Sequence, residues 1–155
     1  MRVVVYGGRE YGVPKKYYVS EEERLYDLET RVMPQRKLFM ETLIKLMDRY
    51  TYPYDPCGKS AKPYLEIISG MATGADSLAV EFAKYFNLKL HEFPADWDRY
   101  KNGAGNIRNQ KMIDEGKPKL GVAFPGGRGT ADMTIRLKFE GIPVKEIVND
   151  DFYFD

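Results

Sequence analysis

Short runs of apolar residues alternate along the chain with longer segments whose apolar positions recur every three or four residues. The apolar runs are 2–6, 64–68, 88–93, 120–124 and 144–148, and the helix-like segments are 35–50, 75–86, 105–115 and 131–139. Strands that alternate with helices predict βαβ units and a mainly parallel sheet. We therefore expect an α/β fold, a Rossmann-like three-layer sandwich of about five strands in the order 3-2-1-4-5.

Two segments depart from this alternation. Residues 10–33 separate the first strand from its helix by an unusually long stretch, which we interpret as an insertion. Within it, Ser20 and Glu23 have the spacing of a capping box, which predicts a short extra helix that ends at about Val32. Residues 52–63 contain three prolines and predict a loop.

The length of the chain suits a single domain. A chain of 155 residues is long enough to bury a core, so we expect residues 1–155 to form one unit. The insertion is rich in tyrosine, with Tyr11, Tyr17, Tyr18 and Tyr26. These rings form either a lid over a cleft or a satellite core or dimer contact, and we favour the second interpretation.

Composition narrows the function classes. Apolar residues make up 43% and charged residues 30% of the chain, which is typical of a globular protein. Lys plus Arg is 24 against 23 for Asp plus Glu, so a general affinity for nucleic acid is not indicated. Cys57 is the only cysteine, and no run approaches 18 apolar residues. We therefore expect a cytoplasmic protein without a membrane partner.

Four loops follow strands and are expected to meet at one edge of the sheet. They are 7–9, 69–76, 94–97 and 125–130. Two of them are rich in glycine and lead directly into helices. Glycine admits positive φ and lets main-chain N–H groups approach a ligand, while a helix N-terminus adds unpaired donors and a positive dipole. Together these features predict a phosphate site, with Arg9, Arg108 and Arg128 as charged partners.

Each loop also has a simpler interpretation, because glycines often make tight turns and nothing more. For 125–130, which directly joins a strand to a helix, we favour phosphate binding. For 69–76 both interpretations stay open. Asp76 and Thr130 can be ordinary helix caps or first-turn residues, which is the commoner role of such residues at these places.

The loop motifs, taken in order, resemble a known family. They are Ser-Gly-x-Ala-x-Gly-Ala-Asp at 69–76, Pro-Ala-Asp-Trp at 94–97, Ala-Gly-x-x-Arg-Asn at 104–109 and Pro-Gly-Gly-x-Gly-Thr at 125–130. This series is similar to the SLOG superfamily, especially its YspA branch, which is related to YpsA; Gly8-Arg9 also fits the start of that branch. The resemblance spans residues 2 to about 148. It implies a Rossmann-like fold, nucleotide-related ligands and, since relatives are often dimeric, a homodimer.

One departure from the superfamily bears on catalysis. Its Lonely Guy phosphoribohydrolases extend the last motif to a glutamate that acts in cleaving the N-glycosidic bond, and Met133 stands at that position here. Asp132 is adjacent, but one helical residue is a rotation of about 100°. Arg108 with Met112 does reproduce an Arg-x-x-x-Met spacing of those enzymes. The resemblance thus implies a retained phosphate site without the hydrolytic acid, unless Glu10, Asp76 or Asp96 replaces it.

The predicted function is binding or sensing of a phosphorylated nucleoside or an NAD-derived nucleotide such as ADP-ribose. Asp76 is a candidate partner for ribose hydroxyls. The predicted ligand-binding residues are Gly8, Arg9, Ser69, Gly70, Gly74, Asp76, Arg108, Asn109, Pro125, Gly126, Gly127, Gly129 and Thr130. The alternative is a nucleotide N-glycosidase with a non-standard carboxylate. A third, weaker interpretation is single-stranded DNA binding, which the resemblance implies through DprA, another member of that superfamily.

We expect neither a cofactor nor a metal site. His91 is the only histidine, and it has no histidine or cysteine nearby in the sequence to complete a zinc site. The run Cys57-Gly58-Lys59-Ser60 resembles the end of a P-loop. Pro53 replaces the required first glycine, however, and Pro63 blocks the helix that should follow, so we interpret this segment as a surface loop.

Overall fold

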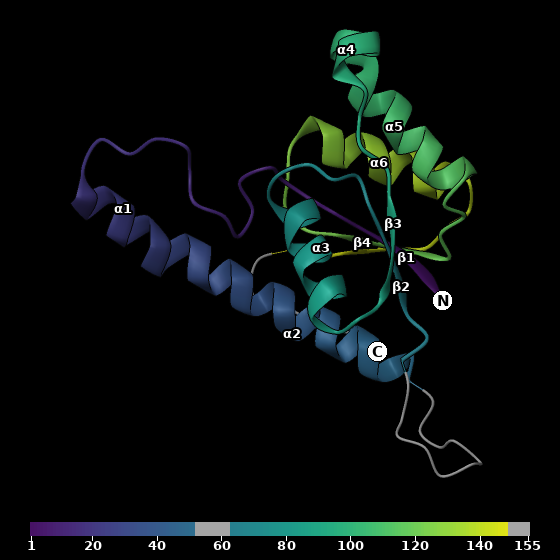
Figure 1. Ribbon diagram of the computed structural model, residues 1–155, viewed down its shortest axis with the longest axis horizontal. Helices are drawn as coiled ribbons and strands as arrows, with labels where there is room; N and C mark the ends of the chain where they lie inside the picture. Colours follow the sequence, from purple (N-terminus) through teal and green to yellow (C-terminus); the bar gives the residue numbers. More distant parts are fainter. Residues whose placement is uncertain (52–62, 149–155) are drawn as a thin grey trace.

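A parallel sheet of five strands forms the centre of the molecule (Figure 1). The computed structural model describes residues 1–51 and 63–148. The strands are β1 (Arg2–Tyr6), β2 (Glu66–Ser69), β3 (Lys89–Glu92), β4 (Leu120–Ala123) and β5 (Val144–Glu146). Their order is β3-β2-β1-β4-β5, and every neighbouring pair runs parallel. The predicted fold class and strand order are confirmed.

Helices cover both faces of this sheet. The helices α2 (Met33–Arg49) and α3 (Ala75–Tyr85) cover one face, and α5 (Ala104–Asp114) and α6 (Arg128–Phe139) cover the other. Side chains of β1 alternate between the two layers. Val3 and Val5 belong to the core with α2 and α3, whereas Val4 and Tyr6 pack with α5 and α6. None of the described helices combines the length and apolar character needed to cross a bilayer.

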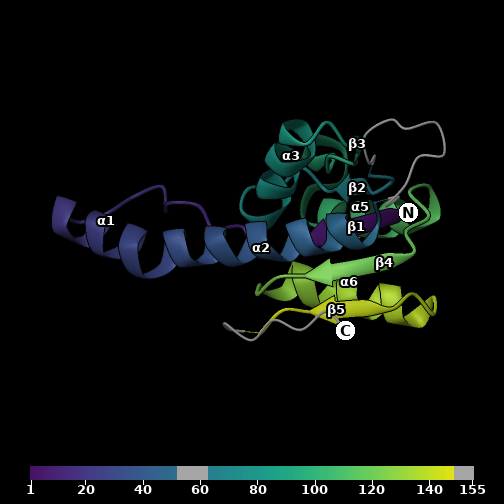
Figure 2. The same cartoon turned by 90° about the horizontal axis from the view of Figure 1, so that it is seen from below.

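The insertion after β1 forms a helical arm, which corrects the predicted separate helix. The segments α1 (Glu21–Asp27), η1 (Leu28–Val32) and α2 follow one another without a break. Pro34 lies in the first turn of α2 and interrupts the ordinary hydrogen-bond register, and the turn before it is π-helical. The α1 end extends well beyond the sheet (Figure 2), and α1 has no buried residue. We refer to Glu21–Val32 as the arm.

The predicted start of this arm is confirmed, with one difference in its cap. Ser20 is the N-cap, and its hydroxyl accepts a hydrogen bond from the Glu23 N–H at 3.1 Å. The carboxylate of Glu23 turns back to the N–H of Val19 at 2.7 Å, one residue before the N–H of a standard capping box.

Other boundaries moved by a few residues. The last large helix, α6, begins at Arg128 instead of 131, which places its first turn inside the glycine-rich loop. A short helix, α4 (Trp97–Tyr100), and a 3-10 turn, η2 (Lys101–Gly103), join β3 to α5 and were not predicted. The predicted loop at 52–63 falls outside the described residues except for Pro63, which forms an antiparallel bridge with Thr51.

Candidate functional site

The turn after β1 connects the loops that follow its two neighbouring strands. The N–H of Gly8 donates to the carbonyl oxygen of Pro125 at 2.9 Å. The carbonyl oxygen of Gly8 accepts from the N–H of Ala75 at 3.2 Å and from that of Tyr11 at 3.1 Å. The three loops after β1, β2 and β4 therefore meet at one point, as their positions at the carboxyl edge of the sheet require.

Two of the predicted glycines are needed for this packing. Gly74 has a φ of +80°, and a Cβ there would overlap the carbonyl oxygen of Gly8. At Gly126, a Cβ would overlap the hydroxyl oxygen of Thr130 and lie 2.6 Å from the backbone nitrogen of Gly8. The turn-making interpretation is therefore sufficient to explain these two glycines.

Gly127 and Gly129 are in a different situation. An added Cβ would meet no atom of residues 1–51 or 63–148 within 4 Å at either position. Both residues line a pocket of about 310 Å³, which we call the amide pocket. Its lining includes Gly8, Arg9, Asp76, Arg108, Asn109, Gly127, Arg128, Gly129 and Thr130. Eight of the thirteen predicted site residues thus lie around one cavity.

The first turn of α6 offers free main-chain donors to this pocket. Gly127 is the N-cap, its carbonyl accepts from the N–H of Ala131 at 3.0 Å, and no side chain of the described residues caps the helix. Within the described residues, the N–H groups of Arg128, Gly129 and Thr130 have no hydrogen-bond partner. The first turn contains no acidic residue. Unpaired N–H groups and the positive end of the helix dipole favour an anion here.

Arg108 carries positive charge to the same cavity. Its Nη1 donates to the carbonyl oxygen of Gly70, and its Nε donates to the side-chain oxygen of Asn109 at 3.1 Å. A Cβ at Gly70 would lie 2.6 Å from that Nη1, so glycine makes room for the guanidinium. Burial lowers the pKa of Arg108, while the nearby carboxylate of Asp76 raises it. Arg9, in turn, lies over the ring of Trp97, 5.2 Å from its centre.

Asp76 is a buried carboxyl group in the wall of the pocket. It is 5% exposed and lies in the first turn of α3, whose N-cap is Gly74. Its Oδ2 accepts from the N–H of Ala72 at 3.3 Å. Burial raises the pKa of Asp76 to about 6, against the opposing effects of Arg108, the Ala72 N–H and Arg9. A carboxyl group with such a pKa exchanges a proton near neutral pH.

The floor of the amide pocket is apolar. Met112 and Met133 are each 1% exposed, and both line the pocket. Asp132 does not line it. Its carboxylate accepts from Arg136 at 2.8 Å and from Asn109 at 3.0 Å, on the side of α6 that faces α5. The sequence-based interpretation that Asp132 points away from the site therefore agrees with its contacts.

Five predicted site residues lie outside the amide pocket. Ser69 is fully buried and lines neither pocket on this side; its hydroxyl donates to the carbonyl of Asp76 at 3.0 Å and accepts from the N–H of Met71. Gly74 serves the loop contact described above. Pro125 and Gly126 line another pocket, of about 260 Å³, beside β5, which shares Gly127 and Thr130 with the amide pocket. Gly70 lines a larger cavity next to the amide pocket.

This larger cavity, which we call the basic pocket, has a volume of about 800 Å³. It shares Arg9, Ala72, Trp97 and Arg108 with the amide pocket, and the start of the insertion forms its outer wall. Lys15 and Lys16 line this wall, and sequence reasoning missed them. The pattern Pro-Lys-Lys at 14–16 was the available signal, but the path of the insertion could not be deduced from it.

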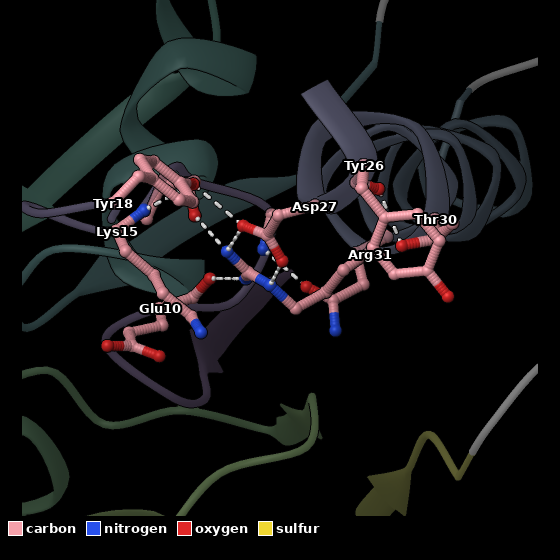
Figure 3. A network of polar contacts seen from close by, with 10 residues as sticks. Glu10, Lys15, Tyr18, Tyr26, Asp27, Thr30 and Arg31 are labelled. Atoms are coloured by element: carbon pink, nitrogen blue, oxygen red, sulfur yellow. Dashed lines mark hydrogen bonds and ion pairs between the residues drawn. The ribbon is translucent and has the colours of Figure 1, made fainter. Parts of the chain in front are cut away.

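The arm holds this outer wall in place (Figure 3). Arg31 forms a two-point ion pair with Asp27, at 2.6 Å for each contact. The same guanidinium donates to the carbonyl oxygens of Glu10 at 2.6 Å and Val13 at 3.0 Å. Arg31 lowers the pKa of Asp27 to about 2, with help from the hydroxyl of Tyr18. A single side chain of the arm thus connects two points of the insertion loop.

The tyrosines of the insertion divide between core, network and surface. Tyr11 is 4% exposed, and its ring lies 5.1 Å from that of Phe124 in the main core. Tyr18 belongs to the arm network through Asp27. Tyr17 and Tyr26 are exposed. The residues that the structure describes bring together no group of three side chains suited to holding a metal ion.

Fold and loop geometry together define a Rossmann-like α/β protein with a glycine-rich cavity at the carboxyl edge of its sheet. No protein-family model matches the chain, and no solved structure matches it. The Gene 61 protein of Mycobacterium phage D29 is 36% identical over 90 residues, which cover 53% of this chain and 71% of the phage protein. The chain therefore belongs to the same family as that phage protein.

Proposed function

We propose that this protein binds a nucleotide-type ligand, a phosphorylated nucleoside or an NAD-derived nucleotide such as ADP-ribose, in a sensing or regulatory role. The observation that carries the proposal is the first turn of α6. Three main-chain N–H groups there lack partners among the described residues, and two glycines leave the approach to them open. This arrangement suits a phosphate group.

Neighbouring side chains are suited to contact the charged groups, the base and the ribose of a nucleotide. Arg108 and Arg9 bring positive charge to the cavity, and neither forms an ion pair among the described residues within 4 Å. Trp97 is 45% exposed beside Arg9 and offers a ring face for a base. Asp76 is a candidate acceptor for ribose hydroxyls. The likeness of four loop motifs to the SLOG superfamily supports the same ligand class.

Binding and turnover can be separated in one experiment. The protein is incubated with AMP, NAD and ADP-ribose, and both melting temperature and free base are followed. A ligand at about one hundred times its Kd stabilises the folded state by about 2.7 kcal/mol. For a chain of this size we expect a rise in melting temperature of about 5–10 °C without base release. If only oligonucleotides raise the melting temperature, the proposal fails.

One observation favours a second candidate, a nucleotide N-glycosidase. Of the three carboxylates that are candidates to replace the absent glutamate, Asp76 lines the amide pocket and has a pKa raised to about 6. Glu10 lines the basic pocket instead, and Asp96 caps α4 by accepting from the N–H of Arg99. Base release that disappears in Asp76→Asn, with nucleotide affinity retained, would establish this activity.

A further inference from the structure

The amide pocket and the basic pocket form one continuous lining. Arg9, Trp97 and Arg108 belong to both, so they lie at the boundary between the two spaces. The amide pocket, at about 310 Å³, is at the lower limit of ligand sites, whereas the basic pocket is more than twice as large. A ligand that fills both is therefore larger than a nucleoside monophosphate.

The charge of the basic pocket is one-sided. Arg9, Lys15, Lys16 and Arg108 line it, and Glu10 is the only carboxylate that the described part of the chain adds to that lining. No ion pair within 4 Å joins either lysine to an acid in the described ranges 1–51 and 63–148. The whole chain has a formal charge of only +1, so this is a local concentration of positive charge. Such a cavity favours an anion.

The lysines are held over the cavity by the arm. The N–H of Lys15 donates to the hydroxyl of Tyr18 at 2.9 Å, and that hydroxyl donates to Asp27 at 2.7 Å. Arg31 pairs with Asp27 and binds the loop carbonyls at 10 and 13 (Figure 3). The backbone that carries Lys15 and Lys16 is thus fixed before any ligand arrives, which lowers the entropy cost of binding.

Apolar surface accompanies this charge. Trp97 stands at the boundary of the two pockets, and Val13, Pro14, Met71, Pro94 and Ala95 complete the apolar part of the basic pocket. A base or other flat group finds ring and aliphatic contacts there, next to cations that suit a phosphate.

We infer that the ligand is a dinucleotide, with one phosphate on the first turn of α6 and a second phosphate-bearing half in the basic pocket beneath Lys15 and Lys16. This inference rests on the proposed function and adds the size and the charge distribution of the ligand. Both pyrophosphate-linked and phosphodiester-linked dinucleotides share this chemistry.

Titration calorimetry with three probes tests the inference. The probes are AMP, NAD as a pyrophosphate-linked dinucleotide, and pApA as a phosphodiester-linked one. We expect at least one dinucleotide to bind about tenfold or more tightly than AMP, since each additional charge-assisted contact contributes about a factor of ten. The better dinucleotide identifies the linkage. Equal affinity for AMP and both dinucleotides would overturn the inference and leave the proposed function standing. If none of the three probes bound, both the inference and the proposed function would be wrong.

Variants then locate the second subsite. Changing both Lys15→Ala and Lys16→Ala should remove the advantage of the dinucleotide and leave AMP affinity within about twofold. Arg31→Ala should act in the same direction, because it releases the loop that positions Lys15 and Lys16 without changing either side chain. A matched control changes Lys37→Ala and Lys84→Ala, two exposed lysines outside both pockets, and should keep the advantage. If the double lysine variant lost affinity equally for AMP and for the dinucleotide, the assignment would be refuted. It would also be refuted if the protein bound a twelve-nucleotide oligothymidylate more tightly than any dinucleotide.

Discussion

Asn109 donates a hydrogen bond from its side-chain amide to the carboxylate of Asp132, 3.0 Å away, and a second to the carbonyl oxygen of Gly129, 3.2 Å away. Asn109 is 4% exposed and belongs to α5, whereas both acceptors belong to the first turns of α6. The direction of the free N–H groups of α6 therefore depends on a side chain from a neighbouring helix.

Replacing Asn109 should weaken this junction. In Asn109→Leu these two hydrogen bonds and the one that Asn109 accepts from Arg108 Nε are lost. We expect the free energy of unfolding to fall by about 1–3 kcal/mol, because the Gly129 carbonyl and the Asp132 carboxylate each lose a donor, although Asp132 keeps its contact with Arg136. Urea unfolding measures the change. Asn106→Ala, at an exposed position of the same helix, should stay within about 0.5 kcal/mol of the wild type. Equal stability of the leucine variant would show that the junction does not depend on this side chain.

Gly127 offers a direct test of the phosphate position. A Cβ at this residue meets no atom within 4 Å, so Gly127→Asp and Gly127→Asn should both fold. The aspartate places a negative charge where the anion should bind, and we expect nucleotide affinity to fall by about a hundredfold or more. The asparagine has nearly the same shape without the charge and should bind far better. Calorimetry with AMP measures the affinity of each variant, and circular dichroism checks that each is folded. Similar affinities of the two folded variants would show that the phosphate does not bind beside Gly127.

Two glycines in the site loops should respond oppositely to alanine. Gly74→Ala adds a side chain to a residue with positive φ and presses it against the carbonyl oxygen of Gly8. We expect the free energy of unfolding to fall by about 3 kcal/mol or more. Gly129 lies in the first turn of α6 with open space around it, so we expect Gly129→Ala to raise the free energy of unfolding by up to about 1 kcal/mol. Chemical unfolding of both variants measures these two changes in stability. If Gly129→Ala lost as much stability as Gly74→Ala, the prediction would be wrong.

Asp76 should make the stability of the protein depend on pH in an unusual direction. Its pKa is about 6 in the folded state against about 3.9 in an unfolded chain, so the folded state binds more protons between these values. The free energy of unfolding from this group therefore falls as pH rises from about 4 to about 6, and then stays level. The shift corresponds to a loss of about 3 kcal/mol at most.

The test is the difference between wild type and Asp76→Asn across this pH range. Asparagine keeps an oxygen for the Ala72 N–H but has no charge to bury. We expect the variant to gain stability relative to the wild type between pH 4 and pH 6, as urea unfolding at each pH measures. Asp98→Asn, at an exposed position, should show no such trend. A constant difference for Asp76→Asn would refute the pKa assignment.

Much of the architecture was predictable because local sequence patterns indicate its strands and helices. Alternating apolar runs and helical spacings identified every strand and large helix of the sandwich, and the preference for right-handed crossovers gave the strand order. The glycine-rich loops were placed correctly at the carboxyl edge, since that follows from parallel strands alone. Local pattern failed at Pro34, where a π-helical turn let the helix continue through a residue that usually marks its start.

The sequence by itself determined the parallel sandwich and the four loops that meet at its edge. It also determined that residue 133, close behind the last glycine-rich loop, is a methionine, which cannot transfer a proton. Only the tertiary structure decided that Gly74 and Gly126 serve loop packing while Gly127 and Gly129 face open space, because identical residues differ only in what surrounds them. The basic wall formed by Lys15 and Lys16 also depends on contacts between distant residues, since Arg31 holds a loop that lies 18 and 21 positions earlier in the chain.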